Sequence, residues 1–112
     1  GGLEDPDYLE ALAHVRTTIG EEGIQAVMAE NDLVALIAPT SGPAFETDLE
    51  HGDRIRVPVA GGPAAASGYP HLTVPMGEVG DLPVGLSFFA GPWQDATVLS
   101  LGHAFEQRLH PR

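Results

Sequence analysis

The chain has 112 residues, 43% of them hydrophobic, so it is long enough for one folded unit with an apolar core and too short for two. Its sixteen acidic residues against five arginines give a formal charge of −11. Nucleic acids and anionic membranes require a basic face, so neither is expected as a partner. The absence of cysteine excludes disulfides and thiol chemistry. No apolar run reaches the ~20 residues of a membrane span, and no signal peptide opens the chain, so we expect a cytoplasmic protein.

The N-terminal third predicts two helices. Asp5 and Pro6 are typical of a helix start, because aspartate caps the first turn and proline at the first position loses no hydrogen bond. An apolar stripe with helical spacing follows and is interrupted at Gly20. A second helix is expected from Glu21 to about Glu30, since acidic residues suit the positive end of a helix.

Residues 33–38, LVALIA, are six consecutive apolar residues after an Asn-Asp turn. A strand that is apolar on both faces suits a central position in a parallel sheet, with layers above and below. Three helices cannot cover that much apolar surface in so short a chain. We therefore expect an exposed apolar patch, a homo-oligomer or a partner segment from elsewhere.

Residues 68–89 predict a β-hairpin. Leu72, Val74 and Met76 alternate on one face of the first run, and three further apolar residues alternate on the second: Val84, Leu86 and Phe88. Residues 77–81 are expected to form a five-residue loop between them. The prolines of this stretch belong at strand starts, bulges or edges, because proline cannot donate to a ladder.

Helices are expected on either side of the hairpin. The small residues 59–67 predict a short helix that Gly68 ends. Asp95 opens a last helix whose apolar face should cover the hairpin and consists of Val98, Leu101, Phe105 and Leu109. Trp93 is expected to be a buried anchor between hairpin and helix.

The loop after the first strand holds the candidate binding residues. In α/β sheets, ligands bind in loops at the carboxyl ends of strands, so Thr40 and Ser41 are candidates for lining a substrate pocket. The alternative is that two prolines and a glycine simply turn the chain out of the sheet. Residues 45–56 are expected to be an exposed polar excursion with a turn at residues 51–53.

Other site chemistries find little support. His103 and His110 are spaced for one helix face but lack a third metal ligand, so no metal or cofactor is expected. Ser87 lies in a run that begins like a nucleophile elbow but lacks its final glycine. The glycines before the short helix lack the lysine of a phosphate-binding loop. A dyad of His71 with Asp81 is conceivable, although His71 is better interpreted as an ordinary hairpin residue.

In combination, several stretches resemble the C-terminal end of amidase signature family enzymes: GYPHLTVPMG, LPVGLSFF, Trp93 with DATVLSLGHAFEQRL, and LVALIAPTSGPA upstream. The resemblance covers nearly the whole chain. It implies an α/β fold in which residues 1–112 are one incomplete part of a mixed-sheet domain. The family's catalytic residues are a serine, a second serine in a cis peptide and a lysine. This chain has no lysine, and none of its four serines lies in a Gly/Ser-rich loop of the family's kind. Alanines where family members often carry an asparagine, near Ala65, depart from the pattern.

The resemblance implies a complete enzyme that acts on a small amide through a serine nucleophile, to which this chain contributes no catalytic residue. Three interpretations remain open. The chain is the C-terminal segment of an amidase and inactive alone, a non-catalytic binding or assembly module with the same fold, or an unrelated hydrolase that uses Ser87 or Ser41 with a histidine.

Overall fold

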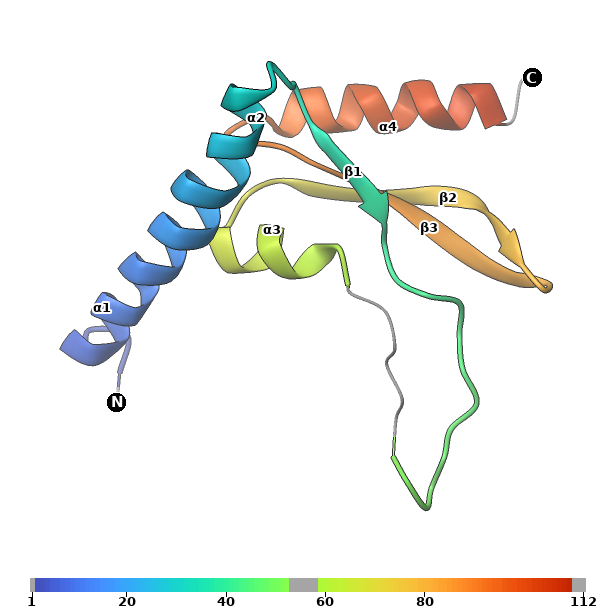
Figure 1. The fold of residues 1–112 in the computed structure, drawn as a ribbon, viewed down its shortest axis with the longest axis horizontal. Coiled ribbons are helices and arrows are strands. Elements are labelled where there is room, and N and C mark those ends of the chain that lie inside the picture. Colours follow the sequence, from blue (N-terminus) through green and yellow to red (C-terminus); the bar gives the residue numbers. More distant parts are fainter. Residues whose placement is uncertain (1, 53–58, 110–112) are drawn as a thin grey trace.

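The computed structural model describes residues 2–52 and 59–109, which form a small antiparallel sheet with helices on both faces. α4 lies along one face of the sheet, and α3 and the N-terminal helical rod lie toward the other (Figure 1). In chain order the elements are α1 (Pro6–Val15), η1 (Arg16–Gln25), α2 (Ala26–Glu30), β1 (Leu36–Pro39), α3 (Gly61–Ser67), β2 (His71–Val79), β3 (Leu82–Phe89) and α4 (Asp95–Leu109).

The N-terminal segment is one continuous helical rod, so the prediction of two helices separated at Gly20 was wrong. The start was predicted correctly, because Asp5 Oδ1 accepts a hydrogen bond of 3.1 Å from the Asp7 N–H. The middle of the rod, η1, is a wider π-helix. Gly20 allows the Tyr69 side chain to pack closely against the helix, since a Cβ at residue 20 would lie 2.7 Å from Oη of Tyr69. The glycine therefore admits a neighbouring side chain and does not end a helix.

β1 is an edge strand of this chain, whereas the sequence predicted a central parallel strand buried on both faces. The sheet order is β1-β3-β2, and β1 runs antiparallel to β3. Leu36 and Ala38 are partly buried, but Ile37 on the opposite face is 63% exposed. The described residues cover only one face of β1, so the expected exposed apolar surface is confirmed, with Leu33 and Val34 extending it.

The hairpin is confirmed, but its connection is shorter than predicted. Gly80 and Asp81 form a two-residue turn with φ of 56° and 64°, as a type I′ turn requires. Residues 77–79 pair with β3 and are not loop. A register shift between Pro75 and Gly77 marks a bulge, which accommodates the proline in this outer strand.

The main core lies between the hairpin and α4, as predicted. Its buried residues are Val74, Leu86, Phe88, Ala90 and Val98, with Leu72, Met76, Leu101 and Phe105 packed against them. The rings of Phe88 and Phe105 meet edge to face at 5.8 Å between centroids. Leu109 is 41% exposed, contrary to expectation, because the hairpin bends away from the last turn of α4 (Figure 1).

Trp93 is not a buried anchor, and this prediction was also wrong. Its side chain is 93% exposed. Its backbone has a φ of 63°, in the left-handed region that a tryptophan seldom adopts. The turn between β3 and α4 therefore points the indole away from the core.

A second, smaller core lies on the opposite face of the sheet. Ile24, Ala64 and Phe89 are buried there, between η1, α3 and β3. α3 begins two residues later than predicted and ends as predicted, at Gly68 with a φ of 77°. The radius of gyration of the chain is 16.8 Å, larger than the roughly 13 Å typical of a compact 100-residue domain. The molecule is therefore open, because residues 41–52 extend away from the sheet (Figure 1).

Candidate functional site

A cluster of polar side chains lies on the sheet face that carries the smaller core. Ser87 stands in the middle strand, with Ala38 of β1 and Thr73 of β2 as its neighbours in register. Thr40 follows directly after β1, and His71 begins β2. Alternation along each strand places these polar residues on the face opposite α4.

Ser87 connects the cluster. Its Oγ lies 2.7 Å from Nε2 of His71 and donates a hydrogen bond of 2.9 Å to Oγ1 of Thr40. Thr40 Oγ1 in turn donates to Oγ1 of Thr73 at 3.4 Å. Ser87 is fully buried, whereas His71 and Thr73 are exposed. The cluster is thus a short chain of hydrogen bonds that begins and ends at the surface.

Gly85 provides the space in which Thr40 approaches β3. A Cβ at Gly85 would lie 2.7 Å from Cγ2 of Thr73 and 2.9 Å from Oγ1 of Thr40. The Thr40 N–H donates to the Gly85 carbonyl at 2.8 Å, which extends the pairing of β1 with β3 by one residue. Any side chain at residue 85 would push the two threonines away.

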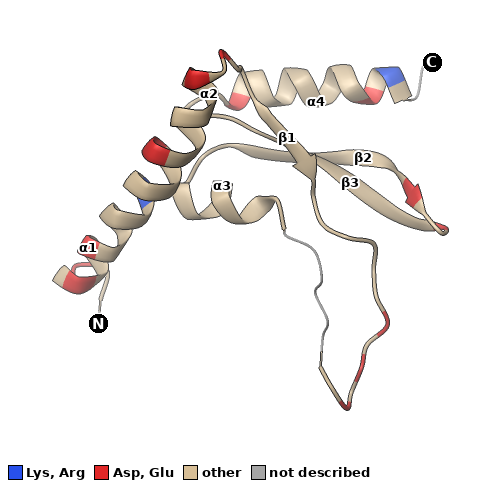
Figure 2. Ribbon diagram, in the orientation of Figure 1, with Lys and Arg blue, Asp and Glu red and all other residues tan. Residues whose placement is uncertain are grey.

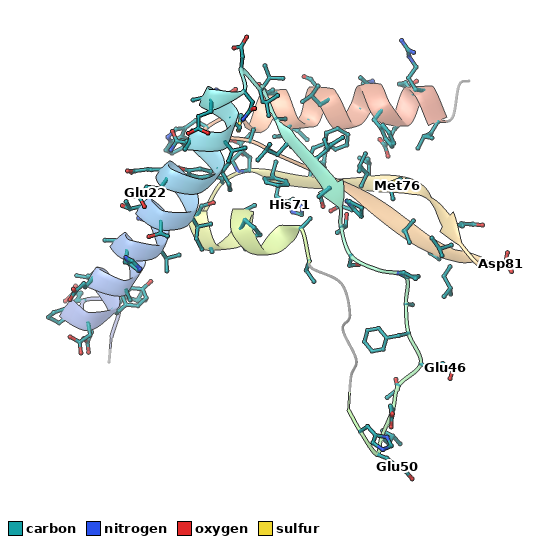
Figure 3. All side chains as sticks on the ribbon, in the orientation of Figure 1. Glu22, Glu46, Glu50, His71, Met76 and Asp81 are labelled. Carbon is teal, nitrogen blue, oxygen red and sulfur yellow. The ribbon has the colours of Figure 1, made fainter. Side chains whose placement is uncertain are left out.

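His71 is held against the start of α3. A Cβ at Gly61 would lie 3.5 Å from Cε1 of His71, and the His71 ring centroid is 6.3 Å from that of Phe89. Figure 3 shows His71 between α3 and the sheet. The sequence interpretation of His71 as an ordinary hairpin residue missed this contact. The alternative partner, Asp81, lies in the hairpin turn at the far end of β2.

The pair of Ser87 and His71 is not arranged as a nucleophile and its base. A general base must accept the hydroxyl hydrogen of the serine. In the structure the Ser87 hydroxyl donates to Oγ1 of Thr40 at 2.9 Å instead. The side chain of Ser87 has no exposed surface at which a substrate carbonyl could arrive. The arrangement can position groups, and it does not activate Ser87.

Ser41 lies beside the cluster and outside it. Its side chain is exposed, and its Oγ donates to the Gly42 carbonyl at 3.1 Å. The residue lines an open hollow of about 1250 Å³ in front of the loop. The other lining residues are Gly42, Pro43, Ala44, Phe45, Glu46, Thr47, Asp48, Leu49, His51, Gly52, Val59 and Pro83. Thr40 and Ser41 were predicted together as pocket-lining residues, but Thr40 lies in the polar cluster and Ser41 lines the hollow.

The far end of this loop is organised by Asp48. A turn is present at residues 48–52, slightly earlier than the predicted turn at residues 51–53. The Gly52 N–H donates to the Asp48 carbonyl at 2.9 Å, and Gly52 has a φ of 75°. Asp53 lies outside the described residues. The Asp48 carboxylate accepts hydrogen bonds from the backbone N–H groups of His51 and Glu50 at 2.9 and 3.0 Å. These bonds, that of His51 first, hold the pKa of Asp48 below its ordinary value.

Acidic residues outnumber basic ones in the described part of the chain. They are spread over the N-terminal rod, the loop after β1 and the hairpin tip (Figure 2). Within residues 2–52 and 59–109, no group of three His, Cys, Asp or Glu side chains is placed to hold a metal ion. His110 lies beyond the described residues. Across the same ranges, no helix has both the length and the apolar character needed to cross a membrane.

Comparisons with known proteins identify the family. No family model matches the chain. It is 35% identical over 109 residues to the glutamyl-tRNA(Gln) amidotransferase subunit of Desulforudis audaxviator, over 95% of this chain and 22% of that protein. It is 40% identical to the solved peptide amidase of Stenotrophomonas maltophilia, with a TM-score of 0.81 over 96% of this chain and 21% of that structure. The chain belongs to the amidase signature family. It spans only about a fifth of the length of these relatives.

A further solved structure gives the same result for the fold. It is a peptide amidase in complex with the competitive inhibitor chymostatin, 42% identical to this amidase signature chain with a TM-score of 0.84. The α/β fold with helices around a small sheet is therefore that of an amidase signature protein, as the sequence predicted. The polar cluster was not predicted. Its only signal in the sequence is that His71, Thr73 and Ser87 fall on the hairpin face opposite the apolar one.

Proposed function

We propose that this chain is the C-terminal part of an amidase that hydrolyses an amide C–N bond, and that its catalytic serine lies outside these residues. The observation that carries the proposal is the 40% identity to a peptide amidase over 96% of the chain. The absence of lysine from the sequence supports placing the catalytic residues elsewhere. The isolated chain is then inactive.

The proposed reaction has two steps. A serine hydroxyl attacks the amide carbonyl, the C–N bond breaks, and the nitrogen leaves as ammonia or an amine after taking up the serine proton. Water then attacks the resulting ester, which releases the carboxylic acid and restores the serine. Preorganised backbone N–H groups would stabilise the negative oxygen that develops in each step.

Thr40 and Ser41 are the proposed contribution of this chain to substrate binding. They follow the end of β1, and the hydroxyl of Ser41 is exposed beside the hollow that the loop lines. A hydroxyl can donate to the carbonyl or accept from the N–H of an amide, so either residue fits a small amide substrate.

The open form of the chain supports a structural role in a larger protein. Ile37 and Val34 are 63% and 67% exposed, although apolar side chains at a strand are normally covered. We propose that either further structure of the enzyme or a second copy in a homo-oligomer covers them. We also propose a cytoplasmic location, and the charge of −11 supports the proposed absence of nucleic acid partners.

The test is amide hydrolysis by the full-length protein. We expect release of ammonia from a C-terminally amidated peptide, stoichiometric labelling by a fluorophosphonate at a serine outside these residues, and no activity from the 112-residue chain alone. Thr40→Val should raise KM, and Ser100→Ala, on an exposed face of α4, should leave the kinetics unchanged. A full-length protein that is labelled by the probe but hydrolyses no amide contradicts the proposal.

The alternative function is that of a non-catalytic binding or assembly module with this fold. A stable, monodisperse monomer of the 112-residue chain that unfolds cooperatively would favour it, because a part of a larger enzyme should expose apolar surface and associate. Sedimentation of the purified chain at several concentrations separates the two.

A further inference from the structure

The loop after β1 begins and ends at two residues, Thr40 and Ala60, that are joined by a backbone hydrogen bond. The Ala60 N–H donates to the Thr40 carbonyl at 2.9 Å, and the Thr40 N–H donates to the Gly85 carbonyl at 2.8 Å. The backbone of Thr40 is therefore tied both to β3 and to the residue before α3.

The side chain of Thr40 is held by a second route. Ser87 Oγ donates to Thr40 Oγ1 at 2.9 Å, and Ser87 is fully buried in the middle strand, so its position is set by the sheet. Ser87 Oγ also lies 2.7 Å from Nε2 of His71. The His71 ring lies beside Gly61, the residue after Ala60, where an added Cβ would be 3.5 Å from Cε1 of the ring. A closed ring of contacts thus runs from Thr40 through Ala60 and Gly61 to His71, and back through Ser87.

We propose that Ser87 and His71 are positioning residues that act through Thr40 to fix the substrate-binding segment of Thr40 and Ser41. The inference rests on the proposed function for its catalytic consequence. Ser87 does not touch the substrate, because it is buried and its hydroxyl donates to Thr40. His71 acts through its contact with Ser87. Their effect is on the rotamer of Thr40 and on the backbone from which Ser41 projects.

The contact between Ser87 and His71 adds a spectroscopic consequence. Nε2 of His71 lies 2.7 Å from Oγ of Ser87, so its nitrogen chemical shift depends on that contact. The Nε2 shift should therefore change when the Ser87 hydroxyl is removed.

The test compares two buried serines in the full-length protein. Ser87→Ala removes the contact to Thr40, whereas Ser67→Ala removes a buried hydroxyl bonded only to the Pro63 and Ala64 carbonyls within α3. For Ser87→Ala we expect KM for a peptide amide to rise about fivefold or more, with kcat within about twofold. Hydrogen exchange at the Ala60 amide should accelerate about tenfold. Ser67→Ala should change neither quantity.

Thr40→Val is the second variant, for the case that Ser87→Ala does not fold. Thr40 is only partly buried, so the loss of its hydroxyl is compatible with folding. It should raise KM as Ser87→Ala does, and the double variant should be no worse than either single one, because both changes break the same bond. Additive effects on KM would overturn the inference.

The nitrogen chemical shifts of His71 complete the test. The Nε2 shift should differ between the wild type and Ser87→Ala, because the variant lacks the hydroxyl beside that nitrogen. Unchanged Ala60 exchange and unchanged His71 shifts in Ser87→Ala overturn the inference, whatever the kinetics. If the full-length protein cleaves no amide, the proposed function fails, and the Ala60 exchange and His71 shifts still decide whether the ring of contacts positions Thr40.

Discussion

Nε2 of His71 lies 2.7 Å from Oγ of Ser87, and the serine hydrogen points away from it, toward Thr40. A serine beside a histidine is the usual mark of an activated nucleophile, but here the serine hydroxyl donates to Thr40 and not to the histidine. Burial of Ser87 closes the approach of a substrate from the other side. The geometry thus argues against Ser87 as the nucleophile of an unrelated serine hydrolase.

The reactivity of Ser87 can be checked directly. We expect the intact mass of the folded 112-residue chain to be unchanged after treatment with a fluorophosphonate. Trypsin treated in parallel controls for probe activity. One probe adduct that disappears in Ser87→Ala would show an activated Ser87 and contradict the hydrogen-bond directions in the structure.

Gly20→Ala should destabilise the chain by about 1–2 kcal/mol, although alanine favours helices by about 1 kcal/mol over glycine. The new Cβ would meet the Tyr69 ring, with Oη at 2.7 Å and Cζ at 3.0 Å, and would displace it from its contact with Gln25. Urea unfolding measures the change. In a Tyr69→Phe background the cost should shrink, and Gly62→Ala, which meets nothing within 4 Å, should be neutral or stabilising.

Gly102→Ala should be destabilising by about 1–3 kcal/mol, because its Cβ would overlap Cδ2 of Leu72 and crowd Cγ1 of Val74 at 3.3 Å. This is the point at which α4 crosses β2. A double-mutant cycle with Leu72→Ala tests the cause, since the smaller residue makes room. Gly102→Ala should cost less, or even stabilise, in that background. Strict additivity would mean that the two sites do not touch.

The turn at Asp48 should weaken in acid. Hydrogen bonds from His51 and Glu50 lower the pKa of the carboxyl in the folded chain, so the carboxylate contributes stability above its unfolded pKa. That contribution is lost as the pH falls through the folded pKa. The amide shifts of Glu50 and His51 should follow this titration in NMR spectra. Asp48→Asn should abolish the pH dependence; a titration of these amides that persists in Asp48→Asn would assign it to another group.

Trp93, the only tryptophan, should behave as a solvent-exposed fluorophore in the 112-residue chain. Its side chain is 93% exposed, so we expect red-shifted emission and quenching by iodide close to that of the free amino acid. Trp93→Gly should stabilise the chain by up to about 1 kcal/mol, because glycine adopts a φ of 63° without strain. Blue-shifted, quencher-resistant emission would place the indole in an apolar environment instead.

The apolar pattern predicted those parts of the fold that pack within the chain. Alternation in the hairpin and the stripe at Val98, Leu101 and Phe105 identified the main core, because both faces of that interface belong to this sequence. The exposed apolar surface of β1 was predicted from the shortage of covering helices, but its position at the edge of an antiparallel sheet was not. The prediction failed at Trp93, which is as apolar as the core residues, and only the tertiary arrangement reveals that the described residues leave it exposed.

The candidate site was predicted in part. The end of the first strand placed Thr40 and Ser41 on a loop, but the contact of Thr40 with Ser87 joins residues 47 positions apart in the sequence. That contact depends on the strand order β1-β3-β2, which places β3 between its neighbours. The role of Gly85 could not be predicted from the sequence either, because it depends on the side chains of Thr40 and Thr73, which pack against this glycine in the folded sheet. Strand pairing had to be known before either could be found.

The bond between the Ala60 N–H and the Thr40 carbonyl has a consequence for engineering. Because the two ends of the intervening segment meet at one hydrogen bond, residues 41–59 can be exchanged as a cassette. A short turn joining Thr40 to Ala60 should leave the sheet and α3 in place, and segments transplanted from other amidase signature proteins should be accepted at the same junction. Substrate preference could then be altered by loop exchange without redesigning the core.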